Sequence, residues 1–242
     1  MAMQAKADGY LGILLPNENA AEAVLVDELD IYCFEHLTEV VEFITQPNTK
    51  SPIKKSGLVQ DYKIKSATDF SDVKGQQNVK RALEIASAGS HNIIMIGPPG
   101  AGKTMLAKSI VSILPPLNQM EALETSKIYS ITGKLDAVNK LLQTRPFRHP
   151  HHSLSSIALI GGGSHPQPGE ISLAHNGILF LDELPEFNRS VIEVLRQPME
   201  EGIVCIARAK MSVTFPARFM LMAAMNPCPC GCWRRIWPTR MK

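Results

Sequence analysis

The sequence of 242 residues predicts an α/β fold built on a parallel sheet, and three observations lead to that prediction. Residues 97–104 form a glycine-rich stretch that follows residues 91–96, an apolar run that we expect to form a short buried strand, and precedes a helical pattern. Ile178–Leu181 and residues 219–225 are apolar runs, typical of strands covered on both faces. Polar residues follow each of the three runs. Because the carboxyl ends of parallel strands bind ligands at one edge of a sheet, we expect these polar residues to lie together.

The composition is that of a globular protein. Apolar residues make up 45% of the chain and charged residues 20%, which is enough for a sizeable core. The apolar runs are far shorter than the ~20 residues of a membrane span, and residues 1–10 lack the pattern of a secretory signal. The five cysteines, an odd count, then favour a reducing, cytoplasmic compartment, and we expect no membrane partner.

The small net charge of +2 hides an asymmetry along the chain. Residues 7–49 contain nine acidic residues and no Lys or Arg, whereas residues 202–242 contain seven basic residues and no acidic one. A basic segment is typical of a nucleic-acid footprint. Taken alone, it is equally typical of a solvated tail.

The amino-terminal segment alternates apolar runs with polar breaks. We expect strands at residues 12–15 and 23–26, a helical turn at 20–23 and a helix at 37–44. A segment of this size cannot bury its own core well, so we expect it to belong to something larger or to be the remnant of a larger domain.

Changes in composition divide the chain into four parts. The amino-terminal part covers residues 1–47, and residues 48–69, rich in Pro, Lys and small polar residues, are typical of a linker. We place the α/β core at residues 70–231 and a separate tail at residues 232–242.

Helical patterns and strands alternate within the core. We expect helices at residues 76–88, 103–112 and 153–160, and two helical patterns split by Gly133 within residues 118–143. Asn176-Gly177 is compatible with a hairpin turn or with the C-cap of a helix at residues 170–175. The Glu, Leu and Ala residues of that stretch favour the helix.

Beyond the second apolar run we expect one helix and a hairpin. The helix covers residues 189–201, with Asn188 as its cap and Gly202 at its end. The hairpin joins residues 203–206 to 211–215 and carries Arg208 and Lys210 at its tip.

Residues 97–104, Gly-Pro-Pro-Gly-Ala-Gly-Lys-Thr, fit the pattern G-x-x-x-x-G-K-[ST] of a loop that wraps nucleotide phosphates. Its glycines allow the backbone to point N–H groups at an anion, and the helix that follows adds the positive end of its dipole. Lys103 supplies a cation for the phosphates and Thr104 a hydroxyl for Mg²⁺. We therefore expect a nucleoside triphosphate such as ATP, bound with Mg²⁺. The expected cofactor-binding residues are Gly97, Pro98, Pro99, Gly100, Ala101, Gly102, Lys103, Thr104 and Met105.

Two carboxylates follow the buried strand Ile178–Leu181. Asp182 can hold Mg²⁺ through water, and Glu183 can orient and deprotonate the attacking water. Asn226 follows the strand at residues 219–225, where its amide can hydrogen-bond the γ-phosphate or that water. On its own, Asn226 is as well explained by a turn before Pro227.

Five segments together resemble the Mg-chelatase-like AAA+ ATPases of the ComM/YifB type: GPPGAGKT, RPFRHPHHS, PGEISLAHNG, LFLDELPEFNR and AAMNPCPCG. The resemblance covers about residues 73–231 and implies a five-stranded parallel ATPase core in a homo-oligomeric, hexameric ring. It implies that Lys103 and Thr104 are Walker A residues, Asp182 and Glu183 Walker B residues, and Asn226 sensor 1, with Glu183, Lys103 and Asn226 catalytic.

The same resemblance implies a DNA partner. In related ring motors the hairpin at residues 203–215 and the loop at residues 161–169 face the central channel, so Arg208 and Lys210 would contact a nucleic-acid backbone. ComM members are associated with DNA processing as branch-migration motors. Residues 10–46 are similar to the end of the Lon-protease-like α+β domain that precedes the ATPase in this family.

Both ends of the chain depart from the family pattern. The amino-terminal domain is shorter than expected, and the sequence after Gly231 does not continue into the helical lid with its sensor 2 arginine. We expect a fragment with an intact phosphate loop and impaired hydrolysis, since a transition-state arginine is worth about 10³–10⁵ in rate. Two alternatives to a DNA motor remain: the ATPase subunit of a chelatase that inserts metal into a porphyrin, and a nucleotide-binding protein without turnover.

Two further clusters are candidate metal sites. His149, His151 and His152 follow two arginines, but adjacent histidines in a strand point to opposite faces, which favours an interface or nucleic-acid role over metal binding. Thiolates at the density of Cys228, Cys230 and Cys232 bind Zn²⁺ readily, although their spacing is not standard and no fourth ligand is evident.

Overall fold

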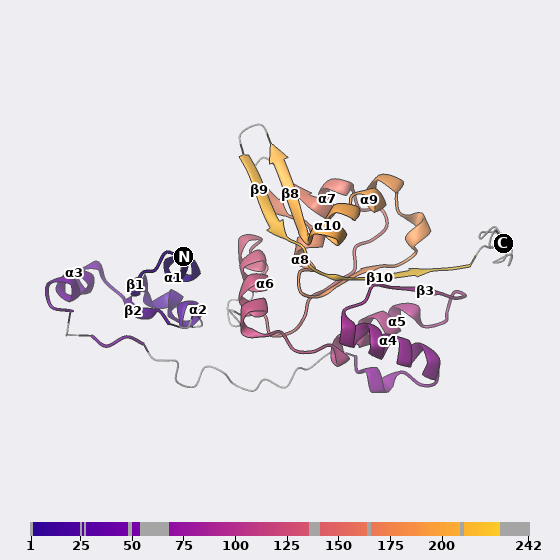
Figure 1. Cartoon of the computed structure of the whole chain (residues 1–242), viewed down its shortest axis with the longest axis horizontal. Coiled ribbons are helices and arrows are strands. Elements are labelled where there is room, and N and C mark those ends of the chain that lie inside the picture. The colour runs from indigo at the N-terminus through magenta and orange to yellow at the C-terminus, as the bar shows by residue number, and fades with distance from the viewer. Residues whose placement is uncertain are drawn as a thin grey trace. The chain divides into compact units, whose positions relative to one another are not determined.

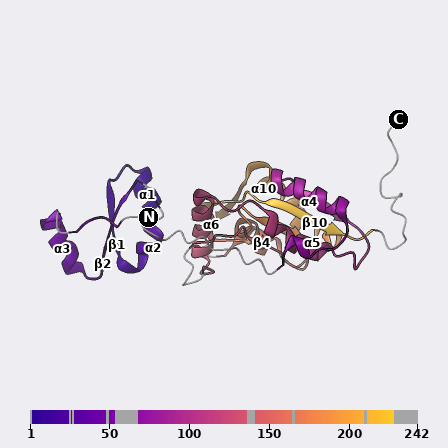
Figure 2. The ribbon, with the colours of Figure 1, turned by 90° about the horizontal axis from the view of Figure 1, so that it is seen from below.

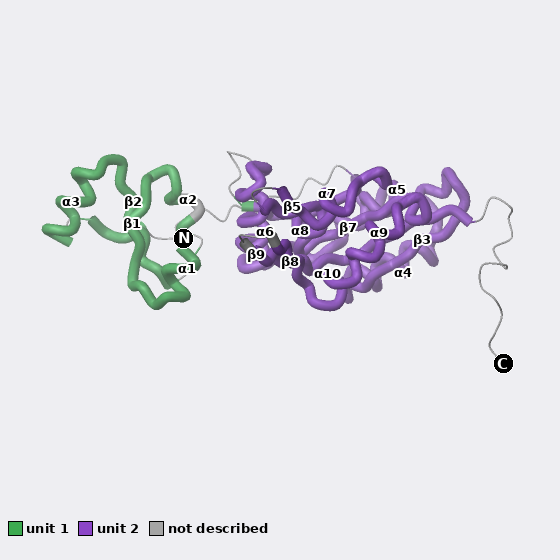
Figure 3. The backbone as a smooth tube through the Cα atoms, turned by 90° about the horizontal axis from the view of Figure 1, so that it is seen from above, with its two compact units in different colours: residues 1–63, 136–141 green, residues 64–135, 142–242 purple. Residues whose placement is uncertain are grey.

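The computed structural model of the chain describes residues 2–24, 26, 28–47, 50–53, 68–135, 141–163, 166–208 and 211–227. The chain forms two compact units, one of residues 1–63 with 136–141 and one of residues 64–135 with 142–242 (Figure 3). Most of the expected linker and the whole expected tail lie outside the described residues, so the four-part division of the chain stays a prediction. None of the helices in the described residues is long and apolar enough to cross a membrane.

The first unit contains two short parallel strands and small helices. Strand β1 (Gly12–Pro16) pairs with β2 (Asp30–Phe34), from Gly12 opposite Asp30 to Pro16 opposite Phe34. The helical elements are α1 (Ala2–Ala7), η1 (Asn17–Asn19), α2 (Ala20–Ala23) and α3 (Leu37–Thr45). The expectations for β1, α2 and α3 are confirmed.

The strand expected at residues 23–26 is wrong. The N–H of Val24 donates to the carbonyl of Ala20, which continues the helical turn of α2, and β1 pairs instead with β2. Alanine-rich sequence favours a helix, and this local preference prevails here.

The core of the first unit is small. Four of its buried apolar residues form one cluster, Ala23, Val24, Ile31 and Cys33. On α3 the apolar residues Leu37 and Ile44 are 79% and 65% exposed, so these two side chains are not covered by described residues. The expectation that this segment buries its own core poorly is confirmed.

The second unit is built on a parallel sheet with the strand order β3-β10-β7-β4. The strands are β3 (Ile93–Ile96), β4 (Phe147–Arg148), β7 (Ile178–Leu181) and β10 (Met220–Met225). All three pairings are parallel, as expected, with Met222 opposite Ile93 and Phe147 opposite Ile178. The described residues give this sheet four strands, whereas the family resemblance implied five.

Helices cover both faces of this sheet (Figures 1 and 2). On one face lie α4 (Gln77–Gly89), α5 (Lys103–Ser109) and the short helix η4 (Ile110–Ile113), and on the other α7 (Ser156–Ile160) and α9 (Arg189–Glu193). Strand β7 alternates between them: Phe180 joins the first core cluster and Leu179 the second, both fully buried. The sequence expectation of a strand covered on both faces is confirmed for β7.

The remaining elements surround this framework. They are η3 (Phe70–Asp72), α6 (Gln119–Ile131), β5 (Gly161–Gly162), β6 (Gln167–Pro168), α8 (Glu170–Leu173), η5 (Leu184–Glu186) and α10 (Arg196–Glu201). Strands β8 (Ile203–Arg208) and β9 (Met211–Pro216) form the expected antiparallel hairpin. Helix α8 precedes Asn176, and Ile178 begins a strand whose pairings are parallel, so the helix is confirmed and the hairpin alternative at this position is wrong. Asn176 has φ 57°, the left-handed conformation that is common just after a helix.

Two expectations for this unit need correction. Strand β3 is not fully buried, because it is the last strand in the order of the described sheet, and Ile94 and Ile96 are 50% and 41% exposed. The single helix expected at residues 189–201 is broken between α9 and α10. Pro198 explains the break, because it has no N–H to donate and its ring clashes with the carbonyl of Val194, four residues earlier.

Candidate phosphate-binding site

The three segments with candidate residues meet at one edge of the sheet. The phosphate loop follows β3, Asp182 follows β7, and Asn226 follows β10, the strand that pairs with both. The N–H of Gly97 donates to the carbonyl of Met225 at 3.3 Å and so joins the loop to the end of β10. Figure 1 shows the arrow of β10 ending beside the loop after β3.

The loop has the backbone shape that its glycines allow. Gly100 and Gly102 have φ values of 77° and 79°, a region that residues with a Cβ rarely adopt. The N–H of Ala101 donates to the carbonyl of Pro98 at 3.3 Å, and Gln76 Nε2 donates to the carbonyl of Ala101 at 3.1 Å. Helix α5 begins directly after the loop, and the first N–H groups of a helix have no partner within it. These donors fit an anion.

Lys103 is held inside the loop by three acceptors. Its Nζ donates to the carbonyls of Gly97 at 2.8 Å and Pro98 at 3.0 Å, and to Asn226 Oδ1 at 2.9 Å. The last contact joins residues 123 positions apart in the sequence. The structure therefore brings the loop lysine and the amide after β10 into direct contact.

Thr104 and Asp182 form the second direct contact. Thr104 Oγ1 donates to Asp182 Oδ2 at 2.7 Å, and the N–H of Glu183 donates to Asp182 Oδ1 at 3.0 Å. A hydroxyl and a carboxylate oxygen are ligands that Mg²⁺ accepts in phosphate sites. The residues present therefore fit a Mg²⁺ ion that is completed by phosphate oxygens and water.

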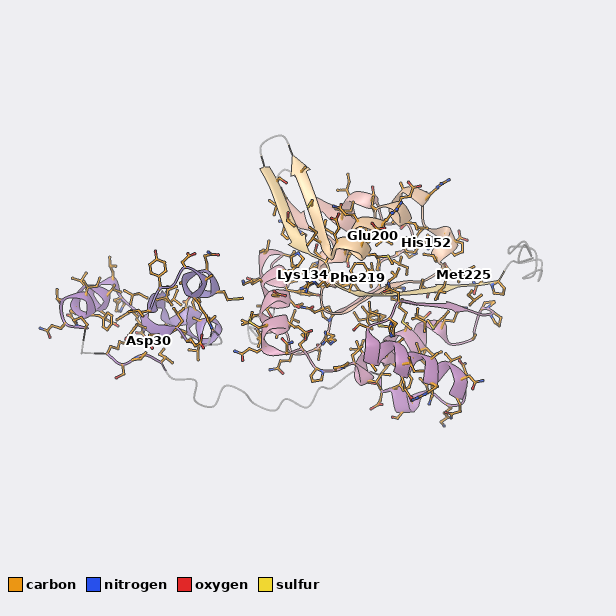
Figure 4. All side chains as sticks on the ribbon, in the orientation of Figure 1. Asp30, Lys134, His152, Glu200, Phe219 and Met225 are labelled. Atoms are coloured by element: carbon orange, nitrogen blue, oxygen red, sulfur yellow. The ribbon has the colours of Figure 1, made fainter. Side chains whose placement is uncertain are left out.

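The Glu183 carboxylate has a different neighbour, a histidine that the sequence interpretation did not connect with it. Its carboxylate Oε2 lies 3.7 Å from His152 Nδ1, and the Glu183 and His152 side chains are 54% and 35% exposed. Figure 4 labels His152, together with Met225 at the end of β10. A contact of this length is an ion pair when the imidazole is protonated, and it is too long for a hydrogen bond.

The argument that adjacent histidines point to opposite faces is wrong here. His151 and His152 lie in a turn, not in a strand, and their ring centroids are 4.0 Å apart. In the described residues, no group of three His, Cys, Asp or Glu side chains is placed to hold a metal ion.

His149 lies between the aromatic core and the carboxylate edge. Its ring centroid is 4.9 Å from that of Phe180. Burial lowers the pKa of His149 from its ordinary value, and the negative charge of Asp182 opposes that shift. The imidazole therefore favours its neutral form.

The two arginines before the histidines bind within the protein. Arg148 makes a two-pronged ion pair with Glu170, at 2.6 and 2.8 Å, and the hydrogen bond to Glu170 raises the pKa of Arg148. Arg145 donates to the carbonyls of Pro115 at 2.6 Å and Asn176 at 2.7 Å. Both arginines fix the framework around β4 and α8, and the interface or nucleic-acid role expected for this cluster stays a prediction.

Some sequence candidates are not described. Lys210, Cys228, Cys230 and Cys232 lie outside the described residues. The backbone of Arg208 ends β8 opposite Met211, and its side chain is outside the described part.

Comparison with known proteins decides the family. Residues 69–238 match the family model described as "Magnesium chelatase, subunit ChlI". The chain belongs to this family. It is 50% identical over 220 residues to the protein YifB of Salmonella typhimurium, covering 90% of this chain and 42% of that protein. It is 47% identical over 224 residues to the competence protein ComM of Haemophilus influenzae, covering 90% of this chain and 43% of that protein.

More distant members of the magnesium chelatase family confirm the fold. The magnesium-chelatase subunit ChlI of Bigelowiella natans is 27% identical over 188 residues, covering 68% of this chain and 52% of that protein. A structure of the complex between subunits BchI and BchD of magnesium chelatase matches 66% of this chain and 55% of that chain, with a TM-score of 0.53 and 21% identity. The chain spans 42–43% of the length of YifB and ComM.

Proposed function

We propose that this chain binds ATP with Mg²⁺ and hydrolyses it at the edge formed by β3, β7 and β10. The observation that carries the proposal is the pair of contacts from Lys103 to Asn226 at 2.9 Å and from Thr104 to Asp182 at 2.7 Å. They join neighbouring residues of the phosphate loop to residues that follow two other strands, the arrangement that ATP and Mg²⁺ require.

Each residue of the site has a role in this proposal. The loop at residues 97–105 surrounds the phosphates, which accept from those of its N–H groups that have no partner within the protein, and Lys103 exchanges protein acceptors for phosphate oxygens. Thr104 and Asp182 hold Mg²⁺, which neutralises charge on the phosphates when it is bound. Glu183 takes the proton of the attacking water, and Asn226 hydrogen-bonds that water or the γ-phosphate.

The binding half of the proposal is tested by Lys103→Ala. We expect at least a tenfold loss of affinity for a fluorescent ATP analogue, about the strength of one charge-assisted hydrogen bond. Lys108→Ala is the matched control, because Lys108 is exposed on the same helix, α5. Equal affinity of the wild-type and Lys103→Ala chains for the ATP analogue would contradict the proposal.

The hydrolytic half is tested by Glu183→Gln. We expect hydrolysis to fall by about 10²–10⁴, the contribution of a general base, while nucleotide affinity stays unchanged. Glu186→Gln is the control, since Glu186 is an exposed acid three residues along the chain. Phosphate release measured in both variants shows whether the loss of rate is specific to Glu183. An equal loss of hydrolysis rate in both variants would contradict the assignment of Glu183 as the general base.

We further propose that the site powers a DNA-processing motor, assembled as a homo-oligomeric ring in the cytoplasm. The name of the 47% identical relative, competence protein ComM, and the basic balance of residues 202–242 support this. The family description and the ChlI relatives favour a second candidate, a metal-insertion chelatase subunit. ATP hydrolysis with branched DNA and with a porphyrin separates the two, because only the true substrate class should raise the rate.

DNA binding by this chain should depend steeply on salt. Basic side chains that contact phosphates release counterions, so affinity falls as salt rises. We propose Arg208 and Lys210 as such contacts, and Arg208→Ala with Lys210→Ala should reduce the slope of log affinity against log salt by about two. Fluorescence anisotropy at several salt concentrations measures the slope, and binding that is insensitive to salt would contradict the assignment.

A further inference from the structure

Glu183 has an unusual backbone conformation for a residue with a side chain. Its φ of 54° and ψ of 48° lie in the left-handed region, where a residue other than glycine pays about 1–3 kcal/mol. The two neighbouring carboxylates serve different partners: Asp182 accepts from Thr104, and Glu183 reaches His152. Strain of this kind at a strand end is common where function fixes a side chain.

His152 is held on two sides by other rings. Its ring centroid is 4.0 Å from that of His151 and 6.4 Å from that of Phe187, which it meets edge-on at 80°. His151 is fixed in turn, since its Nδ1 lies 2.8 Å from Ser153 Oγ, and Phe187 is buried. The imidazole of His152 thus has a ring on two sides, its side chain is 35% exposed, and its Nδ1 faces the Glu183 carboxylate.

The sheet explains why these two residues meet. Strand β4 pairs with β7 in parallel, with Arg148 opposite Leu179, so the chain leaves both strands at the same edge. His152 follows β4 by four residues and Glu183 follows β7 by two. Among the described residues, no other Lys, Arg or His side chain lies within 4.0 Å of the Glu183 carboxylate.

We propose that His152 is a positioning residue for Glu183. An N–H of the imidazole holds Oε2, so that Oε1 is left to receive the proton of the attacking water. A movement of about 1 Å converts the 3.7 Å separation into a hydrogen bond, and displacements of about that size at a reacting group change rates by as much as ~100-fold. The inference rests on the proposed function of the site, because it gives His152 a role only through Glu183.

Binding of a transition-state mimic tests the proposal without turnover. The affinity of the whole chain for Mg²⁺-ADP is compared with its affinity for Mg²⁺-ADP with aluminium fluoride, which resembles the transferring phosphoryl group. We expect His152→Phe to leave ADP affinity within about twofold and to reduce the preference for the mimic about tenfold, the strength of one hydrogen bond to a charged group.

Three variants separate the N–H from the ring. His152→Phe keeps a ring beside His151 and Phe187 but donates nothing, and His152→Ala removes both. His152→Gln restores a donor at similar reach and should keep the preference within about threefold of the wild type. A preference that survives in His152→Phe would show that packing matters and would overturn the proposal. In the Glu183→Gln background, His152→Phe should have no further effect.

A second measurement tests the contact itself without nucleotide. In protein labelled at histidine, Glu183→Gln should shift the imidazole signals of His152 in NMR spectra, and Glu186→Gln should not. Unchanged His152 signals in Glu183→Gln overturn the proposal. A chain that fails to bind ADP refutes the proposed function, whereas one that binds ADP but does not prefer the mimic refutes the positioning role.

Discussion

Lys103 uses the hydrogens of its ammonium group on acceptors within the protein, and Asn226 is the only side chain among them. A bound phosphate must compete with these acceptors for Lys103. We therefore expect Asn226→Ala to change ADP affinity by less than about threefold, because the lost acceptor is replaced by phosphate oxygen.

Hydrolysis should respond differently to the same change. If Asn226 orients the γ-phosphate or the attacking water, Asn226→Ala lowers the rate at least about tenfold at saturating ATP. Titration with a fluorescent nucleotide and phosphate release measure the two effects. A loss of affinity as large as that of Lys103→Ala would contradict this division of roles.

The unfolding free energy of the second unit should depend on pH through His175. Its side chain is almost fully buried, with Nδ1 accepting from the Arg218 N–H at 3.1 Å and Nε2 lying 3.3 Å from Glu124 Oε2. Burial lowers the pKa of His175, and the hydrogen bond and charge of Glu124 oppose the shift. Protonation of Nδ1 would also remove the acceptor of the Arg218 N–H.

The sign of this effect follows from linkage. The folded-state pKa of His175 lies below its unfolded value, so the unfolded chain binds the proton more readily. The contribution of neutral His175 to the unfolding free energy is fully present above the ordinary histidine pKa of about 6.5. It is lost as the pH falls through the lower pKa that His175 has in the folded chain. We expect a smaller unfolding free energy at pH 5 than at pH 7.5 in urea denaturation.

His175→Gln should weaken that pH dependence. The pKa of His149 is also lowered, so His149 accounts for part of the pH dependence that remains in the His175→Gln variant. A pH dependence identical in wild type and His175→Gln would contradict the assignment.

At the scale of elements, the register of β7 depends on the absence of a side chain at Gly177. A Cβ at this position would lie 2.1 Å from the Pro146 carbonyl oxygen and 2.8 Å from the Pro146 nitrogen. Both are backbone atoms of the segment that leads into β4, so neither can move alone. We expect Gly177→Ala to cost about 1–3 kcal/mol of unfolding free energy or more.

Gly133→Ala is the matched control for this prediction. Gly133 has φ 65°, and a Cβ there meets no atom within 4 Å. Its substitution should cost only the ~1 kcal/mol of a left-handed alanine. Urea denaturation compares the two, and equal losses would show that the contact with Pro146 does not determine the effect.

The elements show which parts of the fold a sequence determines locally. Strands β7 and β10 were predictable because each is an apolar run that ends in polar residues, and that rule also brought Asp182 and Asn226 to the phosphate loop. The break between α9 and α10 was missed although Pro198 signals it, because the periodicity continues across it. Strand β2 was missed because its pairing with β1 depends on a contact between segments that the local pattern does not report.

The position of His152 could not be read from the sequence for a related reason. It depends on β4, a strand of two residues that is too short to show an alternating pattern. Only the pairing of β4 with β7 brings the following turn to Glu183. A buried apolar run predicts a strand from the sequence alone, whereas a two-residue strand can be identified only from its pairing with a neighbouring strand.

At the scale of the whole molecule, nucleotide binding should act on one compact unit. The residues proposed to bind ATP and Mg²⁺ all belong to the unit of residues 64–135 and 142–242. A ligand that binds only the folded form stabilises it by about 2.7 kcal/mol at a concentration of 100 times Kd. That corresponds to about a hundredfold slower exchange of those amide protons that exchange with solvent only when this unit unfolds.

Hydrogen exchange measured by mass spectrometry on the whole chain tests this. With Mg²⁺-ADP we expect added protection in β3, β7, β10 and the phosphate loop, because the ligand joins their ends. The first unit, from α1 to α3, should exchange at an unchanged rate, since none of the proposed ligand-binding residues lies in it. Lys103→Ala should abolish the added protection at the same nucleotide concentration. Equal protection of both units would mean that they unfold as one, and nucleotide binding would then stabilise β1 and β2 as strongly as the sheet that holds the site.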